Sequence, residues 1–417
     1  MGNYLDEFRN PETAKKLAGA LKSCDGEKIS IMEVCGTHTM AIFRYGIREL
    51  LPDSIRLISG PGCPVCVTPV SFIDAAVEIA AREGVITASF GDLLKVPGSA
   101  SSLAIAKSEG ADVRIIYSPL DILKIAEENP DKKVVFISVG FETTAPITAL
   151  TVLKAHENGT RNFSVLSANK TMPQALKLLA KRGDSSSKER GKKGDSSSKS
   201  QESREYCDKR DNSEKLGDSS AKEPEKKENE KKEGDSSPNL DGFLYPGHVS
   251  AITGTALYEE LAAGFGMPGV IAGFEPLDLM HAIISLAGII RNHENKVINE
   301  YSRVVRKDGN PVALEKLFEV FEHCTAVWRG LGRVEGSGLR IRDKYERFDA
   351  WKVFGVMPQE GKEPSGCLCG EVLTGRATPG NCGLFGTACT PESPVGACMV
   401  SSEGTCAAYY RFGRRLS

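Results

Sequence analysis

The sequence has no excess of charge of either sign, no long apolar run and no export signal. It has 53 lysines and arginines against 55 aspartates and glutamates, so no basic field suggests nucleic acid and no acidic field a cationic partner. No apolar run reaches the roughly 18 residues that a membrane span requires. Residues 1–16 lack the basic and then apolar pattern of a signal peptide. These absences predict a cytoplasmic protein with no nucleic-acid or membrane partner.

Cysteine is the residue present in unusual number. The 417 residues include 12 cysteines, and six of them lie between positions 367 and 406. A chain without an export signal is expected in a reducing compartment, where structural disulfides are rare. The clustered cysteines are therefore expected to be metal ligands or redox thiols.

One internal segment has almost no apolar residues. Between 183 and 239 the chain consists mainly of Ser, Lys, Glu, Asp and Gly, and the tetrapeptide Gly-Asp-Ser-Ser begins at 183, 194, 217 and 234. Such a stretch buries too little apolar surface to offset its chain entropy. We predict a disordered insertion at 183–239, with Cys207 as a bystander thiol.

In the rest of the chain, short apolar runs alternate with amphipathic segments. Runs rich in Val and Ile predict buried parallel strands, and their alternation with helices predicts an α/β fold. The expected strands are 29–34, 55–59, 85–90, 113–117, 134–139, 163–167, 243–245 and 270–272. The expected helices are 72–82, 120–128, 147–156, 172–181, 277–291, 296–305 and 313–328.

The strand count suits two parallel-sheet α/β domains, followed by a C-terminal cysteine-rich domain. We expect the first domain at 1–120 and the second at 121–300, interrupted by the insertion. Residues 301–417 are expected to form a helical segment and then a tail. From about 364 the tail is rich in Gly, Cys and Pro with little periodicity, which is typical of a segment that folds around a cofactor.

Polar or glycine-rich turns follow the expected strands. The carboxyl ends of parallel strands meet at one edge of a sheet, where ligands bind. Cys35, Cys63, Glu142 and His248 all lie in such turns. Turn formation explains the glycines there, but not the Cys, His and Glu side chains that accompany them.

The turn Cys35-Gly36-Thr37-His38 is the first candidate site. Cys35 ends a strand, and the following residues begin a helix expected to reach residue 51. A thiol at a helix N-terminus meets the positive end of the dipole, which favours the thiolate that binds metal. His38, one turn away, is a second ligand, a proton donor or a partner that orients Cys35. A core or capping role for both residues is an equal alternative.

Cys63-Pro64-Val65-Cys66 is a Cys-x-x-Cys motif. Its spacing suits a small disulfide ring or half of a zinc site. Because the chain has no second motif of this kind, dithiol redox chemistry is favoured over zinc or idle thiols.

The tail cysteines are spaced Cys-x-Cys-x12-Cys-x6-Cys-x8-Cys-x7-Cys. Six thiols exceed the four that hold a [4Fe–4S] cluster by two, and the surplus pair could exchange electrons with the cluster. Zinc is the alternative, but zinc sites usually show closely paired cysteine knuckles, which this tail lacks. The pattern favours an iron–sulfur cluster.

Five longer motifs resemble the HypD family of [NiFe] hydrogenase maturation factors, and the resemblance covers the chain outside the insertion. They are EVCGTHT at 33–39, GPGCPVCVT at 60–68, GFETTAP at 140–146, PGHVS at 246–250 and PVGACMVSSEG at 394–404. The resemblance implies two α/β domains with a cluster-bearing C-terminal domain. It also implies a scaffold and electron donor on which the Fe(CN)2CO unit is built, with a HypC-type chaperone and the HypE–HypF cyanide donor as partners.

The resemblance also implies roles for individual residues. Cys35 matches the cysteine that binds the iron being assembled, with His38 beside it. Cys63 and Cys66 match a redox pair in a cleft, to which Glu142 and His248 are expected to contribute. The remaining matches are Cys367, Cys382, Cys389 and Cys406 as ligands of the [4Fe–4S] cluster, and Cys369 and Cys398 as a second thiol pair between cluster and cleft.

Two functions remain in competition at this point. The first is the assembly scaffold, a redox-active carrier rather than a conventional turnover enzyme. The second is a cluster-fed thiol-disulfide reductase that acts on protein disulfides. The sequence assigns no role to Cys24 or Cys324.

Overall fold

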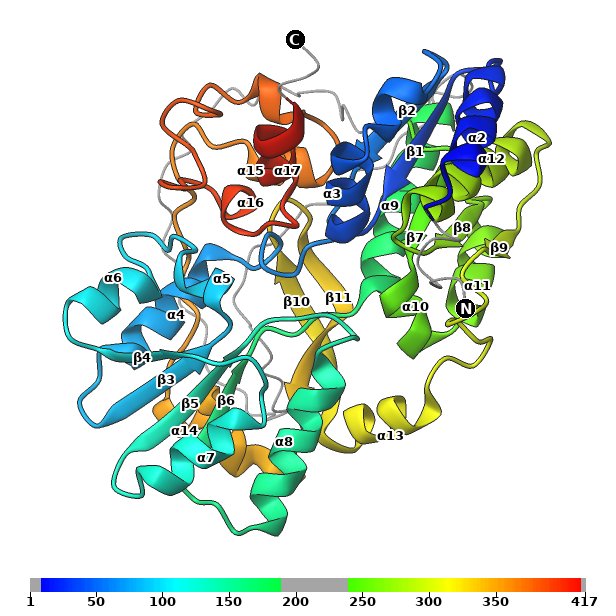
Figure 1. Ribbon diagram of the computed structural model, residues 1–417. Coiled ribbons are helices and arrows are strands. Elements are labelled where there is room, and N and C mark those ends of the chain that lie inside the picture. Colours follow the sequence, from blue (N-terminus) through cyan, green and yellow to red (C-terminus); the bar gives the residue numbers. More distant parts are fainter. Residues whose placement is uncertain (1–8, 189–238, 414–417) are drawn as a thin grey trace, which may run out of the picture.

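The computed structural model describes residues 9–188 and 239–413. Within them the chain forms two parallel β-sheets, a long hairpin between the sheets and a cysteine-rich C-terminal segment (Figure 1). The two-sheet α/β class predicted from the strand–helix alternation is confirmed.

The first sheet, sheet A, has the strand order β2-β1-β7-β8-β9, and all its neighbouring strands are parallel. Four of its strands were predicted from their apolar runs; β9 is short and only partly buried, and was predicted as helix. The strands are β1 Ile29–Glu33, β2 Ile55–Ser59, β7 Gly242–Pro246, β8 Gly269–Ala272 and β9 Val297–Asn299.

The second sheet, sheet B, has the order β4-β3-β5-β6 and is also parallel throughout. Its two middle strands are buried almost along their whole length, which explains their continuous apolar sequences. The strands are β3 Val85–Ser89, β4 Asp112–Ile115, β5 Lys133–Ser138 and β6 Phe163–Ser167.

Strand pairing does not follow the expected domain division near residue 120. Strands β1 and β2 pair with β7 to β9 from the far side of the insertion, while β3 to β6 form sheet B by themselves. The division near 120 assumed that neighbours in sequence pair in space. Here the chain leaves sheet A after β2, completes sheet B and then returns to sheet A.

Helices cover both sheets. In sheet A, α12 Pro276–Arg291 packs on β7 and β8 and against α2 Pro11–Ser23. Further helices lie between the strands in sequence, in line with the predicted strand–helix alternation. They are α3 Gly36–Arg44, α4 Val70–Ala80, α5 Gly91–Leu94, α6 Leu103–Ser108, α7 Asp121–Glu128, α8 Ala145–Glu157, α9 Met172–Lys188, α10 Gly247–Thr253 and α11 Ala256–Phe265.

A hairpin replaces part of an expected helix. Helix α13 Pro311–Val320 is followed directly by β10 Phe321–Trp328, which pairs antiparallel with β11 Gly332–Ile341. The helix predicted over 313–328 is therefore wrong beyond 320, and the one over 296–305 is replaced by β9 and a turn. In Figure 1 the hairpin lies in the middle of the molecule, between the two sheets.

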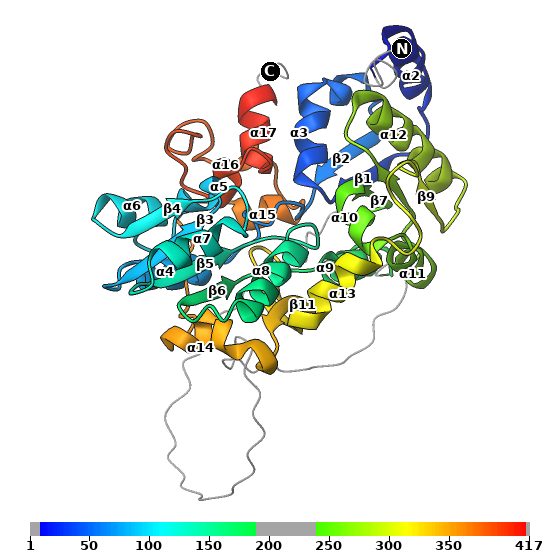
Figure 2. The ribbon, with the colours of Figure 1, turned by 60° about the horizontal axis from the view of Figure 1, so that its bottom comes forward.

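After the hairpin, α14 Ala350–Phe354 packs on β6. The tail then passes to the end of sheet A at which α3 begins. Helix α17 Thr405–Phe412 lies beside α3 in both views (Figures 1 and 2), and the rings of Phe43 and Tyr409 join them with centroids 4.4 Å apart. The cysteine-rich tail is thus fixed to the helix that begins after Cys35. Its other elements are α15 Cys369–Leu373 and α16 Ala397–Val400.

Helix α9 reaches Lys188, so the first six residues of the expected insertion are helical instead of disordered. The remainder of that prediction, including Cys207, lies outside the described residues except for Asn239. No helix within residues 9–188 and 239–413 has the length and apolar character to cross a bilayer.

Candidate functional site

A cleft of about 400 Å³ opens where the carboxyl ends of both sheets meet the tail. Each of the three parts contributes to its wall. Sheet A supplies Thr37, Gly62, Pro64, His248 and Phe274, sheet B supplies Phe141, Thr143 and Thr144, and the tail supplies Glu403. The expectation that strand-end turns gather at one place is met, and the two sheets face each other there.

Cys35, the N-cap of α3, does not line the cleft but lies directly behind its wall, where the Cys35 Sγ is 4.0 Å from Nδ1 of the lining residue His248. The Gly36 N–H donates to the Gly62 carbonyl at 3.2 Å, which ties the turn of Cys35 to that of Cys63. A side chain at position 62 would collide with the Cys35 backbone, so glycine is required at this close approach. The two cysteine motifs are thus adjacent in space.

Burial decides the charge of the two side chains that meet here. It raises the pKa of Cys35 to about 12, although the backbone N–H of His38 acts in the opposite direction. Burial also lowers the pKa of His248 to about 4. The expected stabilisation of the thiolate by the helix N-terminus is present but is outweighed by desolvation, so both groups are neutral at pH 7.

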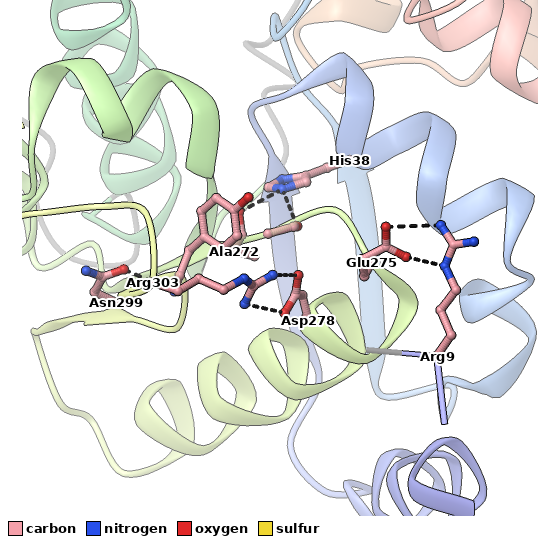
Figure 3. Close-up of polar contacts among 9 residues, drawn as sticks. Arg9, His38, Ala272, Glu275, Asp278, Asn299 and Arg303 are labelled. Carbon is pink, nitrogen blue, oxygen red and sulfur yellow. Dashed lines mark hydrogen bonds and ion pairs between the residues drawn. The ribbon is translucent and has the colours of Figure 1, made fainter. Parts of the chain in front are cut away.

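His38 faces sheet A and not the sulfur of Cys35. Its Nε2 lies 3.0 Å from the Gly273 carbonyl and 3.3 Å from that of Ala272 (Figure 3). Carbonyl oxygens only accept, so Nε2 carries the proton and Nδ1 keeps a lone pair, for which the described residues provide no hydrogen-bond partner. Burial lowers the pKa of His38 to about 3. The ring therefore tethers α3 to the end of β8.

The turn at the end of β8, whose carbonyls accept from His38, is held in place by two ion pairs. Glu275 binds Arg9, with Arg9 Nε 2.7 Å from Glu275 Oε2, and Asp278 binds Arg303 (Figure 3). This arrangement fixes Phe274, whose ring lies 5.0 Å from that of His38 and 5.2 Å from that of His248. One aromatic side chain thus positions both histidines of the site.

A buried carboxylate anchors the start of α3. Glu33, at the end of β1, accepts from Thr39 Oγ1 at 2.6 Å, from Ser59 Oγ at 3.1 Å and from Arg48. A buried charge is tolerated only when it is paired and hydrogen-bonded, as it is here. The carboxylate therefore holds the cysteine-bearing turn against β1 and β2.

Glu142 does not line the cleft, although its neighbours Phe141 and Thr143 do. Its side chain is 2 % exposed, and Oε1 accepts the Met172 N–H at 2.8 Å. The other oxygen has no partner among the described residues, and burial raises the pKa of Glu142 to about 7. The side chain connects the ends of β5 and β6 behind the cleft wall.

Cys63 and Cys66 begin a chain of thiols that runs from the cleft wall to the tail. The Cys66 N–H donates to Cys63 Sγ at 3.2 Å, and the Cys66 thiol interacts with Cys398. Cys398 in turn interacts with Cys369, and both these cysteines interact with Cys406. Cys63, Cys66, Cys398, Cys369 and Cys406 therefore form a continuous series of neighbouring thiols, and the roles expected for them stay predictions.

The tail cysteines surround a small cavity. Its wall holds Cys367, Cys369, Cys382, Cys389 and Cys406, together with apolar side chains of the tail, whereas Cys398 faces Cys66. A Cβ at Gly396 would lie 2.5 Å from Cys369 Sγ and 2.6 Å from Cys367 Sγ. A glycine at 396 thus leaves room for two sulfurs.

This donor set fits a cluster better than a single ion. In the described part of the chain, no three His, Cys, Asp or Glu side chains converge on a point suited to one metal ion. A tetrahedral zinc site needs its four ligands around one point, whereas the irons of a cubane cluster take thiolates at separate corners. Cysteines spread around a cavity are compatible with the second arrangement.

Sequence reasoning missed the contact that joins the tail to the cleft. Thr37 Oγ1 donates to Glu403 Oε1 at 2.6 Å, and Glu403 lines the cleft. Both residues lie within motifs that were recognised, but only their neighbours were considered as site residues. The signal available was a carboxylate in a glycine-rich segment with almost no other charge.

The chain is similar in sequence to known proteins over almost its whole length. The family model HypD, described as "Hydrogenase formation hypA family", matches residues 12–189 and 229–413. The chain belongs to the HypD family. It is 41 % identical to "Hydrogenase maturation factor HypD2" of Bradyrhizobium diazoefficiens over 99 % of this chain and 97 % of the relative. It is 40 % identical to "Hydrogenase maturation factor HypD" of Escherichia coli over 99 % of each chain.

The HypD match also bears on the insertion. Residues 190–228 fall between the two matched segments and lie within the predicted insertion at 183–239. Every motif that carries the resemblance falls inside a matched segment. The family's shared features therefore belong to the sheets, the hairpin and the tail.

Proposed function

We propose that this protein is a scaffold and electron donor on which the Fe(CN)2CO unit of [NiFe] hydrogenases is assembled, with Cys35 as a ligand of that iron. The observation that carries the proposal is the contact of the Cys35 sulfur with His248, which lines a cleft, together with the chain of thiols that leads from Cys66, near this cleft, to the tail cysteines. Iron with strong-field diatomic ligands needs soft, electron-rich donors, and a thiolate is such a donor.

The cleft provides the chemistry that iron binding requires. The Cys35 thiol is neutral because it is buried, and a cation in the cleft would replace its proton. His248, neutral and 4.0 Å away, is placed to take that proton or to orient the sulfur. His38 is expected to act indirectly, by fixing α3.

The thiol chain supports the electron-donor role. Bound at Cys367, Cys382, Cys389 and Cys406, a [4Fe–4S] cluster would supply single electrons. Cys369 and Cys398 lie between those cysteines and Cys66, so they are placed to pass reducing equivalents to the Cys63–Cys66 pair. That pair would cycle between dithiol and disulfide beside the iron.

The assembly of the iron unit also needs partner proteins that supply its other ligands. A HypC-type chaperone would bring a further cysteine ligand to the iron, and a HypE–HypF complex would supply cyanide. The wall of the cleft contains small and polar residues such as Thr143 and Thr144, which leave a bound iron approachable by another protein.

The decisive experiment is an infrared spectrum of the protein purified anaerobically with a HypC partner. The wild type should show CN and CO stretching bands, and Cys35→Ala should abolish them while the cluster absorbance remains. Cys24→Ala is the matched control, because Cys24 ends α2 away from the cleft wall. Bands of normal intensity in Cys35→Ala, or normal hydrogenase maturation in such a strain, would contradict the proposal.

The alternative, a reductase of protein disulfides, is not favoured by the burial of its thiols. Cys63 is 3 % exposed, and Cys66 and Cys398 are 0 % exposed. Thiol–disulfide exchange requires in-line access of a substrate sulfur to the attacking thiolate. A small ligand in the cleft can approach the pair more closely than a disulfide carried on another protein.

A further inference from the structure

A second cavity, of about 380 Å³, lies on the other side of the β6 end from the cleft. Its wall is formed by the end of β6, the β10–β11 hairpin and the segment that contains α14, and none of its residues lines the cleft. Its volume is within the range of roughly 300–1,000 Å³ of small-molecule sites. The proposed function assigns nothing to it.

Lys170 is the unusual residue in this wall. Its side chain is 1 % exposed, and Nζ donates one hydrogen bond, to the Ala168 carbonyl at 3.4 Å. An ammonium group has three donors, and in the described residues Lys170 has no ion pair with a carboxylate. The ring of Trp328 lies 5.9 Å from Nζ, which is a weak compensation for a buried charge.

The other cations of the cavity are already paired. Arg340 binds Glu322, and Lys352 binds Asp343 and Glu346. The half-buried carboxylate in the wall, Asp349, has a structural task, because it accepts the Trp351 N–H at the start of α14. Lys170 is therefore the cation in this wall without a carboxylate partner; the thiol of Cys324, in the same wall, is the titratable group that acts on it.

The rest of the wall is suited to an apolar body. Trp351 presents its ring while its Nε1–H donates to the Ser167 carbonyl, and Ile341, Val356 and Met357 line the cavity beside it. Met357 is 64 % exposed, which indicates that the cavity opens to solvent at that side. The buried cation Lys170 and these apolar side chains thus line the same cavity.

We propose that this cavity binds a small organic anion, with its acidic group on Lys170 and its apolar body against Trp351. Binding would give the buried amine the counter-charge that the chain does not provide. Burial lowers the pKa of Lys170 to about 7, so the amine is partly neutral without an anion and is fully protonated with one. The proposal is independent of the function at the cleft.

The test uses 8-anilinonaphthalene-1-sulfonate, a monoanion with an aromatic body, and the full chain. We expect saturable binding to the wild type, detected by energy transfer from tryptophan. Lys170→Met, which keeps the length of the side chain and removes its charge, should weaken binding at least tenfold, since it removes the charge that pairs with the sulfonate in a buried site. Lys107→Met, at an exposed position on α6, is the matched control and should bind like the wild type.

A second probe separates loss of charge from loss of fold. N-phenyl-1-naphthylamine has the same aromatic body without the sulfonate, so its affinity should be equal in the wild type and in Lys170→Met. A crystal of the sulfonate complex should show the sulfonate within hydrogen-bonding distance of Lys170 Nζ. Unchanged sulfonate affinity in Lys170→Met, equal losses for both probes, or a sulfonate bound elsewhere would overturn the proposal.

Discussion

At the scale of single residues, burial determines the chemistry of this protein more than local sequence does. Cys35 has the helix N-terminus that the sequence predicts, yet desolvation keeps it a thiol. His38 belongs to the same motif, yet the three-dimensional fold directs it to the carbonyls of sheet A, and His248 takes the place beside the sulfur. A motif therefore indicates which residues belong to a site but not which of them meet.

Glu142 should make stability depend on pH. Its pKa of about 7 lies above the value of an exposed glutamate, so the native state holds a proton that unfolding releases. The stability that this proton provides is lost as the pH rises from about 4.5 to about 7. Glu142→Gln, which keeps an acceptor for the Met172 N–H, should stabilise the protein at pH 8 by on the order of 2–3 kcal/mol relative to its effect at pH 4.5.

Urea unfolding of the wild type and Glu142→Gln at the two pH values measures this difference. Glu260→Gln, an exposed position on α11, is the control and should shift stability equally at both. If Glu142→Gln had the same effect at pH 4.5 and pH 8, the carboxyl would not be the protonated group.

Gly396 should be required for binding a cluster in the cysteine-lined cavity of the tail. The reason is that a larger residue has no room there, and not that the backbone needs a glycine. Its φ of −116° is open to any residue, but an added Cβ would collide with Cys367 Sγ and Cys369 Sγ. Gly396→Ala should therefore lower the iron content several-fold and bleach the chromophore.

The control is Gly264→Ala in α11, where a Cβ meets no atom within 4 Å. This substitution should leave iron content unchanged and stabilise the helix by about 0.5–1 kcal/mol. Full iron content in Gly396→Ala would show that the two sulfurs do not need their present positions.

At the scale of elements, the local sequence pattern predicts the strands that are buried on both faces but not the more exposed strands. All eight apolar runs form strands, because a strand buried on both faces is apolar throughout. Strand β10 was predicted as helix because its buried residues Phe321, Ala326 and Trp328 do not alternate regularly along the strand, and no element was predicted for β11, which contains three glycines. Its pairing depends on position between the sheets, which no local pattern encodes.

The sequence likewise predicts one part of the candidate site and not another. The carboxyl-edge rule correctly grouped the turns of Cys35, Cys63 and His248. It could not show that Thr37 binds Glu403, since this contact joins residues 366 positions apart. Long-range pairing of polar side chains follows from the completed fold.

Residues 189–238 are the segment that we expect to be dispensable. Their composition provides no core, and the family match does not include 190–228. Replacing them with a short Gly-Ser link should leave the melting temperature unchanged and preserve binding to a HypC partner. A variant with the same residues in scrambled order is the control; if the link variant failed to bind HypC while the full chain bound, the segment would be a docking arm.

At the scale of the whole molecule, the tail joins α3 and the thiol chain into one structure. The six tail cysteines should therefore fall into two groups, cluster ligands and redox thiols, according to their positions. Single Cys→Ala changes at Cys367, Cys382, Cys389 or Cys406 should lose the brown chromophore. The same change at Cys369 or Cys398 should spare it, although Cys369 lines the cavity as well. Visible absorbance and iron content measure the outcome, and loss of the cluster in Cys369→Ala but not in Cys367→Ala would refute this division.

The return of the chain from sheet B to sheet A sets an order of events during synthesis. The strands of sheet B leave the ribosome as one stretch from residue 85 to residue 167, so they can pair as soon as they emerge. Strands β1 and β2, made earlier, must wait for β7 at residue 242 before sheet A can grow. Cys35 and Cys63 are thus translated early but enclosed late, after most of the polypeptide has been made. A newly made chain therefore keeps the turns of Cys35 and Cys63 open to solvent and to other proteins for longer than the strands of sheet B.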